Sequence, residues 1–478
     1  MKMKFILPAL TEAESPLWRP IKYSLFPPLG LATLAAYLDS SDEAEIVDQH
    51  VEELSLDDYP DIVAIEVYIT NAKRAYKIAD HYRRKSIFVI LGGLHVTSLP
   101  DEASKHADAI FLGPAEESFP RFLKDYRRRA PQERYFSSQR SLIGIPPIRR
   151  DLIKRGLYLV PNSIVVTRGC PHHCEFCYKD DFFKNGRKSF YTQSVDDAIS
   201  EIGRLPGRHL YFLDDHLLGH QYFATNLFRE MQGMGRIFQG AATVDSILRG
   251  DLIEKAADAG LRSVFIGFES LNPDNLKQTN KKQNINRDYD RAINRLHELG
   301  IMINGSFVFG LDSDDSEVFK RTVDWAVKMG ITTATFHIAT PYPDTEFYHK
   351  MQLEQRLLTN DWDCYDTRQV VFQPVGMTAA ELKEGYDSAY WDFYSWSAIA
   401  RSSLFHGSLK HQLKHFFYTS GWKKFEPLWN MIIQMKKLNQ TTPFLEAILS
   451  KVSRLEDGFQ TKTLGKGGSE LSPSHADS

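Results

Sequence analysis

Three of the four cysteines in this 478-residue sequence, Cys170, Cys174 and Cys177, lie within eight residues of one another. So few cysteines do not form the disulfide framework of a secreted protein, and their clustering is typical of metal or redox chemistry in a reducing compartment. Three thiolates in one loop can ligate three irons of a [4Fe–4S] cubane, which leaves the fourth iron without a protein ligand. The alternative is a zinc site with His172 or His173 as the fourth ligand, since zinc binds both residue types.

The spacing C-x3-C-x2-C, with Phe176 before the last cysteine, resembles the signature of the radical S-adenosylmethionine (SAM) superfamily. The resemblance implies that SAM chelates the open iron and is cleaved to a 5′-deoxyadenosyl radical. It makes the three cysteines the catalytic cluster ligands and places Tyr178 beside the cofactors. It also implies an external electron donor such as flavodoxin or ferredoxin.

Two further motifs stand at the ends of predicted strands. Asp214 and Asp215 take the place of a Gly-Gly-Glu stretch that holds the SAM amino group in many members, so one of them is expected on the SAM side, unless the pair caps a helix. The stretch 267–270 resembles a Gly-x-Glu-Ser motif. Glu269 and Ser270 are therefore expected to bind SAM, with capping of the next helix as the alternative.

Residues 1–125 alternate apolar strand-like and helix-like stretches, which predicts a Rossmann-like, doubly wound parallel sheet. The domain resembles the B12-binding domain that is fused to radical SAM barrels. The resemblance implies cobalamin binding at the carboxyl ends of the strands. The same glycines would also serve as tight turns in a domain without cobalamin. The expected cobalamin-binding residues are Gly92, Gly93, Thr97, Gly113 and Glu116.

No histidine stands where cobalamin methyltransferases of another lineage supply a cobalt ligand, in the loop after the first strand. The stretch Asp48-Gln49-His50 follows the second strand instead, and Glu53 stands where that motif has glycine. We therefore expect cobalamin without a histidine on its lower face. Trp18 and residues near Tyr68 are candidates to cover that face.

Six further strand candidates alternate with helices over 161–350 and predict a partial (β/α)6 TIM-type barrel. The cysteine loop follows the first of these strands, where catalytic residues of β/α barrels gather. His337, near the end of the sixth, is a candidate site residue or a structural hydrogen-bonder. The basic, proline-containing stretch 126–160 is predicted to be a linker between the two domains.

Residues 351–456 are predicted to form a mostly helical C-terminal extension, which resembles that of radical SAM–cobalamin enzymes of hopanoid and related lipid biosynthesis. Thr378 and Glu381 have the spacing of a capping box and predict a helix start there. Cys364 is interpreted as a packed side chain rather than a ligand. Residues 457–478 are rich in Gly, Ser, Lys and Pro and are predicted to be a disordered tail.

The overall charge is too small to attract a nucleic acid or an anionic surface over a long range. With 58 basic and 61 acidic side chains the net charge is −3, so no nucleic-acid partner is expected. Seven Lys or Arg residues against one acidic residue in 401–437 are compatible with peripheral membrane contact, or with a packed helical subdomain that has a basic face. Without a signal peptide or an apolar run of about 18 residues, the protein is expected in the cytoplasm.

The sequence as a whole predicts a radical SAM enzyme in which a radical and methylcobalamin together methylate an unactivated carbon of a small molecule, apolar if the aromatic-rich extension contacts it. The second hypothesis is radical-mediated cyclisation, ring contraction or rearrangement without methyl transfer. The third is a non-catalytic corrinoid or redox-sensing module, which would have no use for an open iron. Methyl transfer requires the carboxyl ends of both sheets to face one cavity, bordered by the cysteine loop, Glu269 and the turn at 92–97.

Overall fold

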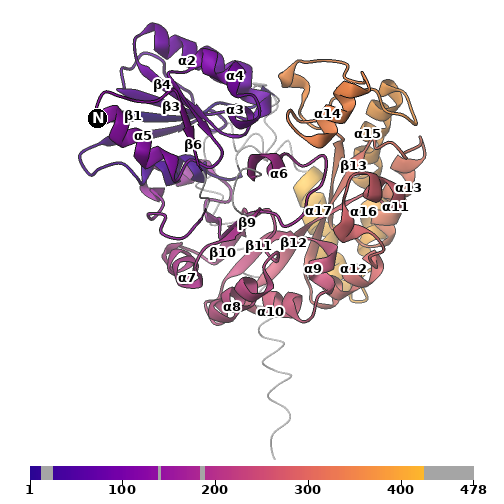
Figure 1. The fold of residues 1–478 in the computed structure, drawn as a ribbon. Coiled ribbons are helices and arrows are strands. Elements are labelled where there is room, and N and C mark those ends of the chain that lie inside the picture. Colours follow the sequence, from indigo (N-terminus) through magenta and orange to yellow (C-terminus); the bar gives the residue numbers. More distant parts are fainter. Residues whose placement is uncertain (12–24, 138–140, 184–188, 425–478) are drawn as a thin grey trace, which may run out of the picture.

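A computed structural model describes residues 1–11, 25–137, 141–183 and 189–424. Its main elements are two six-stranded parallel sheets, the first in the order β2-β1-β3-β4-β5-β6 and the second in the order β14-β13-β12-β11-β10-β7. The two sheets belong to separate lobes, with α6 (Tyr178–Phe183) between them (Figure 1). The predicted α/β fold class is confirmed.

The first sheet has helices and an apolar core on each of its faces. Neighbouring residues of one strand, such as Phe5 and Ile6, belong to opposite cores, which explains why these strands are almost continuously apolar. The strands are β1 (Lys2–Leu7), β2 (Glu43–Asp48), β3 (Ile62–Glu66), β4 (Phe88–Gly92), β5 (Ala109–Leu112) and β6 (Arg134–Phe136). The helices are α1 (Leu29–Ala35), α2 (Ala72–Arg84), α3 (Leu94–Ser98), α4 (Pro100–Ala103) and α5 (Ser118–Arg127).

The segment 126–160 is more than the linker that the sequence predicted. Its strand β6 pairs in parallel with β5 and so extends the first sheet by one strand. Two short 3-10 helices follow, at Arg150–Leu152 and Arg155–Leu157. A three-residue strand next to arginines and prolines has too little periodicity to be recognised in the sequence.

The second sheet contains the six predicted strands of the partial barrel, all parallel. In the described part of the chain its end strands β7 and β14 do not pair, so the barrel stays open on one side. The strands are β7 (Ser163–Ile164), β10 (His209–Phe212), β11 (Ile237–Ala242), β12 (Leu261–Glu269), β13 (Met302–Phe309) and β14 (Thr333–Ile338). The helices are α7 (Val195–Arg204), α8 (Gln221–Met231), α9 (Val244–Leu248), α10 (Leu252–Ala259), α11 (Pro273–Gln278), α12 (Tyr289–Glu298) and α13 (Val318–Lys328).

The first barrel strand is shorter than the sequence indicated. It ends at Ile164, and residues Thr167–Gly169 form β8, which pairs antiparallel with β9 (Phe190–Thr192). The cysteine loop therefore leaves a separate two-stranded ribbon rather than the barrel sheet itself.

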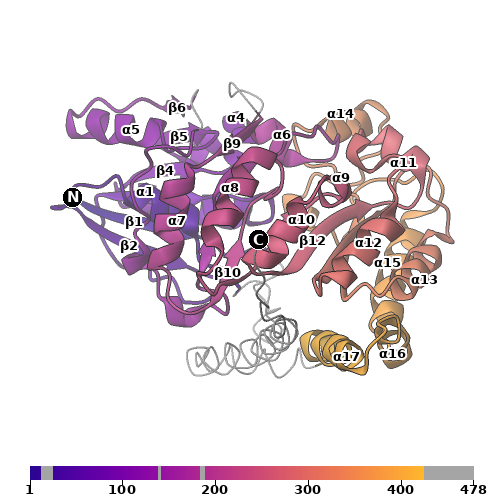
Figure 2. The ribbon, with the colours of Figure 1, turned by 90° about the horizontal axis from the view of Figure 1, so that it is seen from below.

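The C-terminal extension is helical as predicted, and its described helices are α14 (Glu346–Leu353), α15 (Ala379–Phe393), α16 (Trp396–Ser403) and α17 (Leu409–Lys424). The capping box of Thr378 and Glu381 starts α15. Helices α16 and α17 lie at the periphery, below the barrel strands in the view of Figure 2. Residues 457–478, predicted to be disordered, lie outside the described residues, as do 425–456.

Two tyrosines, Tyr390 of α15 and its C-cap residue Tyr394, cover the open edge of β14. The hydroxyl of Tyr394 accepts a hydrogen bond from the Ala334 N–H (3.1 Å) and donates one to the Ala334 carbonyl (2.9 Å). Tyr390 does the same at Phe336, at 3.1 Å each way. These hydroxyls bond the backbone groups that a neighbouring strand would otherwise pair with. An uncovered edge strand could instead pair with a strand of another chain.

No helix among the described residues combines the length and the hydropathy that crossing a bilayer requires.

Replacing Tyr394 by Phe should reduce the protection of the β14 edge against hydrogen exchange. The variant leaves a buried N–H and a buried carbonyl without their partner, at a cost of about 1–2 kcal/mol. Hydrogen exchange of the Ala334 amide should therefore become about tenfold faster. The control is Tyr222→Phe, because Tyr222 is 77% exposed. Unchanged exchange at Ala334 would show that the tyrosine does not protect the strand.

Candidate active site

The cysteine loop is held in place by backbone hydrogen bonds to distant segments. The Glu175 N–H donates to the Thr279 carbonyl (3.1 Å), and the Glu175 carbonyl accepts from the Phe347 N–H (3.1 Å) at the start of α14. Within the loop, the Cys177 N–H donates to the Cys174 carbonyl (2.9 Å). The loop thus joins the segment after β12 to the C-terminal extension.

All three loop cysteines are free thiols. Burial raises the pKa of Cys170 to about 12 and also raises that of Cys177, so without a metal these thiols are neutral at pH 7. Iron would supply the positive charge that removes the protons, since metal binding deprotonates a coordinating thiol.

Groups around the thiols suit a cluster of negatively charged sulfurs. The Gln283 side-chain N–H donates to the Cys174 sulfur at 3.5 Å. Against the effect of burial, the Glu269 carboxylate raises the pKa of Lys281, and Cys174 and Cys177 in their thiolate form raise it further. Hydrogen bonds and cations of this kind stabilise thiolate ligands of iron–sulfur clusters, so the donor set fits a [4Fe–4S] cluster. In the part of the chain that the structure describes, no three His, Cys, Asp or Glu side chains converge on one ion position, the three cysteines included, so this geometry favours neither the cluster nor zinc.

Glu269 forms a buried ion pair with Lys281 at 2.7 Å, and the side chains are 11% and 9% exposed. The backbone of Glu269 is left-handed, with φ +62°, a conformation that costs free energy and persists only because the surrounding contacts hold it. Gly267 makes room for the pair, because a Cβ there would lie within 3.2 Å of the Lys281 nitrogen and closer still to Glu269. Ser270, by contrast, accepts from the Asn272 N–H (3.1 Å) and shapes the local turn.

The two aspartates after β10 hold different segments. Asp214 accepts hydrogen bonds from the backbone N–H groups of Val166 and Thr167, and burial raises its pKa to about 7. Asp215 accepts from the Gly169 N–H (3.2 Å) and pairs with Lys179 of α6. Neither caps a helix, since the next helix begins at Gln221 with His220 as its cap. Asp215 also borders the cavity described next.

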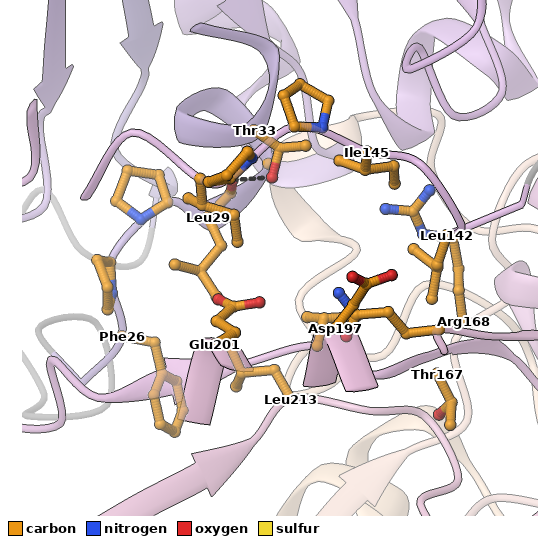
Figure 3. Close-up of a pocket in the computed structure, with 18 of the residues that line it drawn as sticks. Phe26, Leu29, Thr33, Leu142, Ile145, Thr167, Arg168, Asp197, Glu201 and Leu213 are labelled. Carbon is orange, nitrogen blue, oxygen red and sulfur yellow. Dashed lines mark hydrogen bonds between the residues drawn. The ribbon is translucent and has the colours of Figure 1, made fainter. Parts of the chain in front are cut away.

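A cavity of about 640 Å³ lies between the two sheets (Figure 3). Leu7, Glu66 and Tyr68 border it from the carboxyl ends of β1 and β3, whereas Leu213 and Asp215 border it from the barrel. The segment 142–148 closes one side, and α7 contributes Asp197 and Glu201. The carboxyl ends of both sheets therefore face one shared space, as predicted.

A narrower groove of about 230 Å³ continues from this cavity into the first sheet, and Gly30, Glu66 and Arg168 line both. Four of the expected cobalamin residues line the groove: Gly92, Gly93, Gly113 and Glu116. Gly93 has a positive φ of +110°, and a Cβ there would lie 2.9 Å from the Val67 carbonyl oxygen, so this position requires glycine. The cavity and groove together have the size and the mixed lining of a cofactor site.

Thr97 does not line the groove. Its hydroxyl donates to the Gly93 carbonyl (2.9 Å) and accepts from the Gly113 N–H (3.0 Å), so it ties the two glycine turns together. The hydrogen bond that Thr97 was expected to donate to a ligand is thus used within the protein.

Glu116 pairs with Arg168 of β8, next to the cysteine loop, and this ion pair bridges the two domains. The second terminal nitrogen of Arg168, Nη1, is buried and has no hydrogen-bond partner among the described residues. Because Arg168 lines both the cavity and the groove, this donor suits a polar group of a bound cofactor.

His50 is buried and engaged within the first domain. Its Nε2 accepts from the Leu10 N–H (3.1 Å), so Nδ1 carries the proton and donates to Asp48 (2.7 Å). This agrees with the expectation that His50 is no cobalt ligand. At the cavity wall, the Tyr68 hydroxyl donates to Glu66 (3.0 Å), and burial deep between the domains raises the pKa of Glu66 to about 7. Trp18 lies outside the described residues.

Tyr178 lies where three parts of the chain meet. It packs edge-on against Tyr342, with ring centroids 5.6 Å apart, and belongs to a small apolar cluster with Ile69 and Leu94 of the first domain. Cys364 packs against the same cluster, as the sequence interpretation had it. A direct contact of Tyr178 with a cofactor remains a prediction.

A third cavity, of about 670 Å³, occupies the barrel and shares Phe26 with the interdomain cavity. Tyr211, Phe265 and Phe336 line it from the strands. His337 also lines it, with Nδ1 3.1 Å from the Thr367 hydroxyl. The cysteines and Glu269 are not among the lining residues of these three cavities, so the single continuous pocket that we predicted is shown only in part.

Several side chains near the loop were not predicted from the sequence: Arg168, Lys179, Lys281 and Gln283. Each acts through a partner outside its own motif, as Arg168 does with Glu116 and Gln283 with Cys174. A single sequence carries no signal for such pairs, apart from the position of Arg168 and Lys179 directly beside the cysteine motif.

Two family models match the chain. The "Radical SAM superfamily" matches residues 164–326 and the "B12 binding domain" matches residues 23–123. The two matched ranges correspond to the barrel and to the first sheet.

Curated relatives match most of the chain. The bacteriochlorophyllide d C-12(1)-methyltransferase of Chlorobaculum tepidum is 29% identical over 78% of this chain and 84% of its own length. The hopanoid C-2 methylase of Rhodopseudomonas palustris is 24% identical, over 71% of this chain and 66% of its own. The anaerobic magnesium-protoporphyrin IX monomethyl ester cyclase of Rubrivivax gelatinosus is 25% identical, over 77% and 74%.

Solved structures share the fold over nearly the whole chain. The radical SAM methyltransferase TsrM from Kitasatospora setae has a TM-score of 0.61 at 15% identity and covers 90% of this chain and 99% of its own. The cobalamin-dependent SAM radical enzyme OxsB has a TM-score of 0.63 at 14% identity, with coverages of 95% and 75%.

Replacing any one loop cysteine, Cys170, Cys174 or Cys177, by Ala should abolish the binding of four irons after anaerobic reconstitution, because a cubane that loses one of three thiolate ligands is no longer held. Iron and sulfide analysis with electron paramagnetic resonance measures this. Cys364→Ala is the matched control and should keep the cluster. Iron loss in that control would mean that the three loop cysteines are not a sufficient ligand set.

Breaking the Glu269–Lys281 pair should destabilise the fold more than breaking an exposed pair. Glu269→Gln or Lys281→Met leaves a buried charge uncompensated and should cost about 3–5 kcal/mol, whereas the double variant should cost clearly less than the sum. Urea unfolding of cluster-free protein, followed by circular dichroism, measures the free energies. Lys277→Met, which breaks an exposed pair with Asp274, should cost less than about 1 kcal/mol. Additive effects at 269 and 281 would contradict a coupled pair.

Proposed function

We propose that this chain, a radical SAM enzyme with a B12-binding domain, transfers a methyl group to an unactivated carbon of a small, largely apolar molecule. Its cofactors are a [4Fe–4S] cluster, SAM and cobalamin. The observation that carries the proposal is the cavity between the two sheets, which is bordered by residues of both domains and continues toward each of them.

When bound, the cluster with SAM would supply a 5′-deoxyadenosyl radical and cobalamin would supply the methyl group. In this proposal Cys170, Cys174 and Cys177 hold the cluster, and Gln283 and Lys281 stabilise the thiolate charge. Asp215 and Glu269 are the proposed SAM-side carboxylates.

The proposed cobalamin site is the cavity together with its groove. Gly92, Gly93 and Gly113 let the backbone approach the cofactor closely, and Arg168 offers it a buried N–H. The segment 142–148 and α7 form part of the cavity wall. A bound cofactor and substrate would displace water from this space, which protects a reactive radical from side reactions.

The barrel cavity is the proposed substrate site, because it adjoins the interdomain cavity at Phe26. Its walls are rich in aromatic side chains, among them Tyr211, Phe265, Phe336, Tyr386, Tyr390 and Trp391. Such walls suit an apolar or flat molecule, and Asn304, His337 and Arg368 add polar groups to the lining.

The remaining partners belong to the same proposal. An external one-electron donor such as flavodoxin or ferredoxin reduces the cluster, and the cytoplasm keeps the thiols reduced. The proposal also includes peripheral membrane contact through residues 401–437. The structure describes residues 401–424 of this stretch.

Ring formation or rearrangement is the second candidate function, because the matched relatives include an anaerobic cyclase. Reconstituted enzyme should be incubated with reductant, hydroxocobalamin, methyl-labelled SAM and an apolar cell extract. Methyl transfer predicts S-adenosylhomocysteine, 5′-deoxyadenosine and a labelled product. Deoxyadenosine together with an altered but unlabelled product would favour the cyclase-like reaction instead.

The cobalamin site has its own test. Gly30 lines both the cavity and the groove, and a Cβ there would meet only Glu66, so Gly30→Phe should fill the site and lower retained hydroxocobalamin at least about tenfold. Bound cobalamin should be base-off in the ultraviolet–visible spectrum, because the glycine turns favour a buried nucleotide tail and the loop after β1 offers no histidine to take its place on cobalt. Gly203→Phe is the control, since Gly203 lies in a helix with open space beside it. Full cobalt retention in Gly30→Phe, with the iron content unchanged, would place cobalamin elsewhere.

A further inference from the structure

The outer face of α17 exposes an apolar stripe. Leu409, Leu413 and Phe417 stand four residues apart, so they lie on one side of the helix, and they are 69%, 47% and 67% exposed. Leu404, just after α16, is 67% exposed as well. Contiguous exposed apolar side chains of this kind mark an interaction surface.

The same segment is basic. Residues 401–424 contain five Lys or Arg residues and no Asp or Glu, although the whole chain has a net charge of −3. A second copy of this surface would bring like charges together, which disfavours a symmetric dimer through it. An anionic bilayer complements both the charge and the apolar stripe.

The segment is also next to the barrel cavity. Tyr418, on a different face of α17 from the stripe, lines that cavity. Trp391 of α15 lines it too, yet is 77% exposed, so this tryptophan lies at the mouth of the cavity. Trp396, five residues further on, stacks on Phe416 of α17, with ring centroids 6.1 Å apart. Tryptophan and tyrosine favour the boundary between water and acyl chains.

We propose that α16 and α17 dock on an anionic membrane and that the barrel cavity takes its apolar substrate from that membrane. The docking part narrows the peripheral membrane contact of the proposed function to α16 and α17, and it is argued from the exposed stripe and the charge. The second part rests on the proposed function and adds the substrate class: a molecule dissolved in the bilayer. In this arrangement Trp391 and Tyr418 line the passage from the bilayer into the barrel.

Vesicle flotation of cluster-free protein tests the docking. The protein should float with vesicles of phosphatidylcholine and phosphatidylglycerol in equal parts, and not with phosphatidylcholine alone. Leu413→Glu and Phe417→Glu should each lower binding at least about tenfold, and Arg401→Gln about fivefold. High salt should weaken binding. The matched control is Leu353→Glu on α14, since Leu353 is 84% exposed and distant in sequence, and it should bind as the unmodified protein does.

Docking is overturned if the protein does not float with anionic vesicles or binds neutral vesicles equally well. It is also overturned if Leu413→Glu binds the anionic vesicles as well as the unmodified protein does. It is also overturned if light scattering shows a dimer that Leu413→Glu dissociates, because the stripe would then be a contact between copies.

The substrate part is tested with apolar extract dissolved in the anionic vesicles. Leu413→Glu should form at least about fivefold less labelled product from this extract. In a second assay, with SAM and reductant but without vesicles, the variant should release as much 5′-deoxyadenosine as the unmodified enzyme. Loss of both signals would count against the proposed function instead. Equal product from the variant would overturn substrate uptake from the membrane while leaving the proposed function intact.

Discussion

The ion pair between Arg168 and Glu116 joins the two domains where both parallel sheets end. Arg168 is two residues before Cys170, and Glu116 is three residues after the turn at Gly113, so one contact links the cysteine loop to the glycine turns. The carboxyl ends of parallel strands are the edges of these sheets where loops gather for ligand binding. A displacement of one domain against the other would therefore open the cavity between them. The geometry of the whole site depends on this ion pair together with apolar packing between the domains, such as that of Tyr178 with Ile69 and Leu94.

The residues around the thiols show how burial and charge are balanced. The loop places sulfur atoms where burial raises the thiol pKa, and it places Lys281 and an amide N–H beside them. Burial alone would disfavour thiolates, while the neighbouring cation and a bound metal favour them. Lys281 is in turn kept charged by Glu269, whose strained backbone and the adjacent Gly267 allow the close approach.

Sequence reasoning was strongest where the signal is local. The apolar strands, the capping box at Thr378 and the cysteine spacing each depend on neighbouring residues, and the fold class and the helix start were confirmed. It was weakest where short segments gain their structure from distant partners. β6 has three residues and is stabilised by pairing with β5, and β8 separates from β7 because Gly169 and Val166 are held by the aspartates after β10. Thr97 is another example, because its hydrogen-bond partners Gly93 and Gly113 belong to two turns that come together only in the fold. The roles of individual site residues stay predictions for the same reason.

The coverage of β14 by Tyr390 and Tyr394 has a consequence for how the barrel cavity can be altered. One wall of the barrel cavity comes from α15, which contacts the cavity and the strand edge but is not part of the cysteine motif. Substitutions at other cavity-lining positions of that helix, such as Tyr386 and Trp391, would change the shape of the cavity while Tyr390 and Tyr394 keep their hydrogen bonds to β14. The wall of the barrel cavity and the cysteine loop thus lie on separate parts of the chain, so that one can be altered without the other.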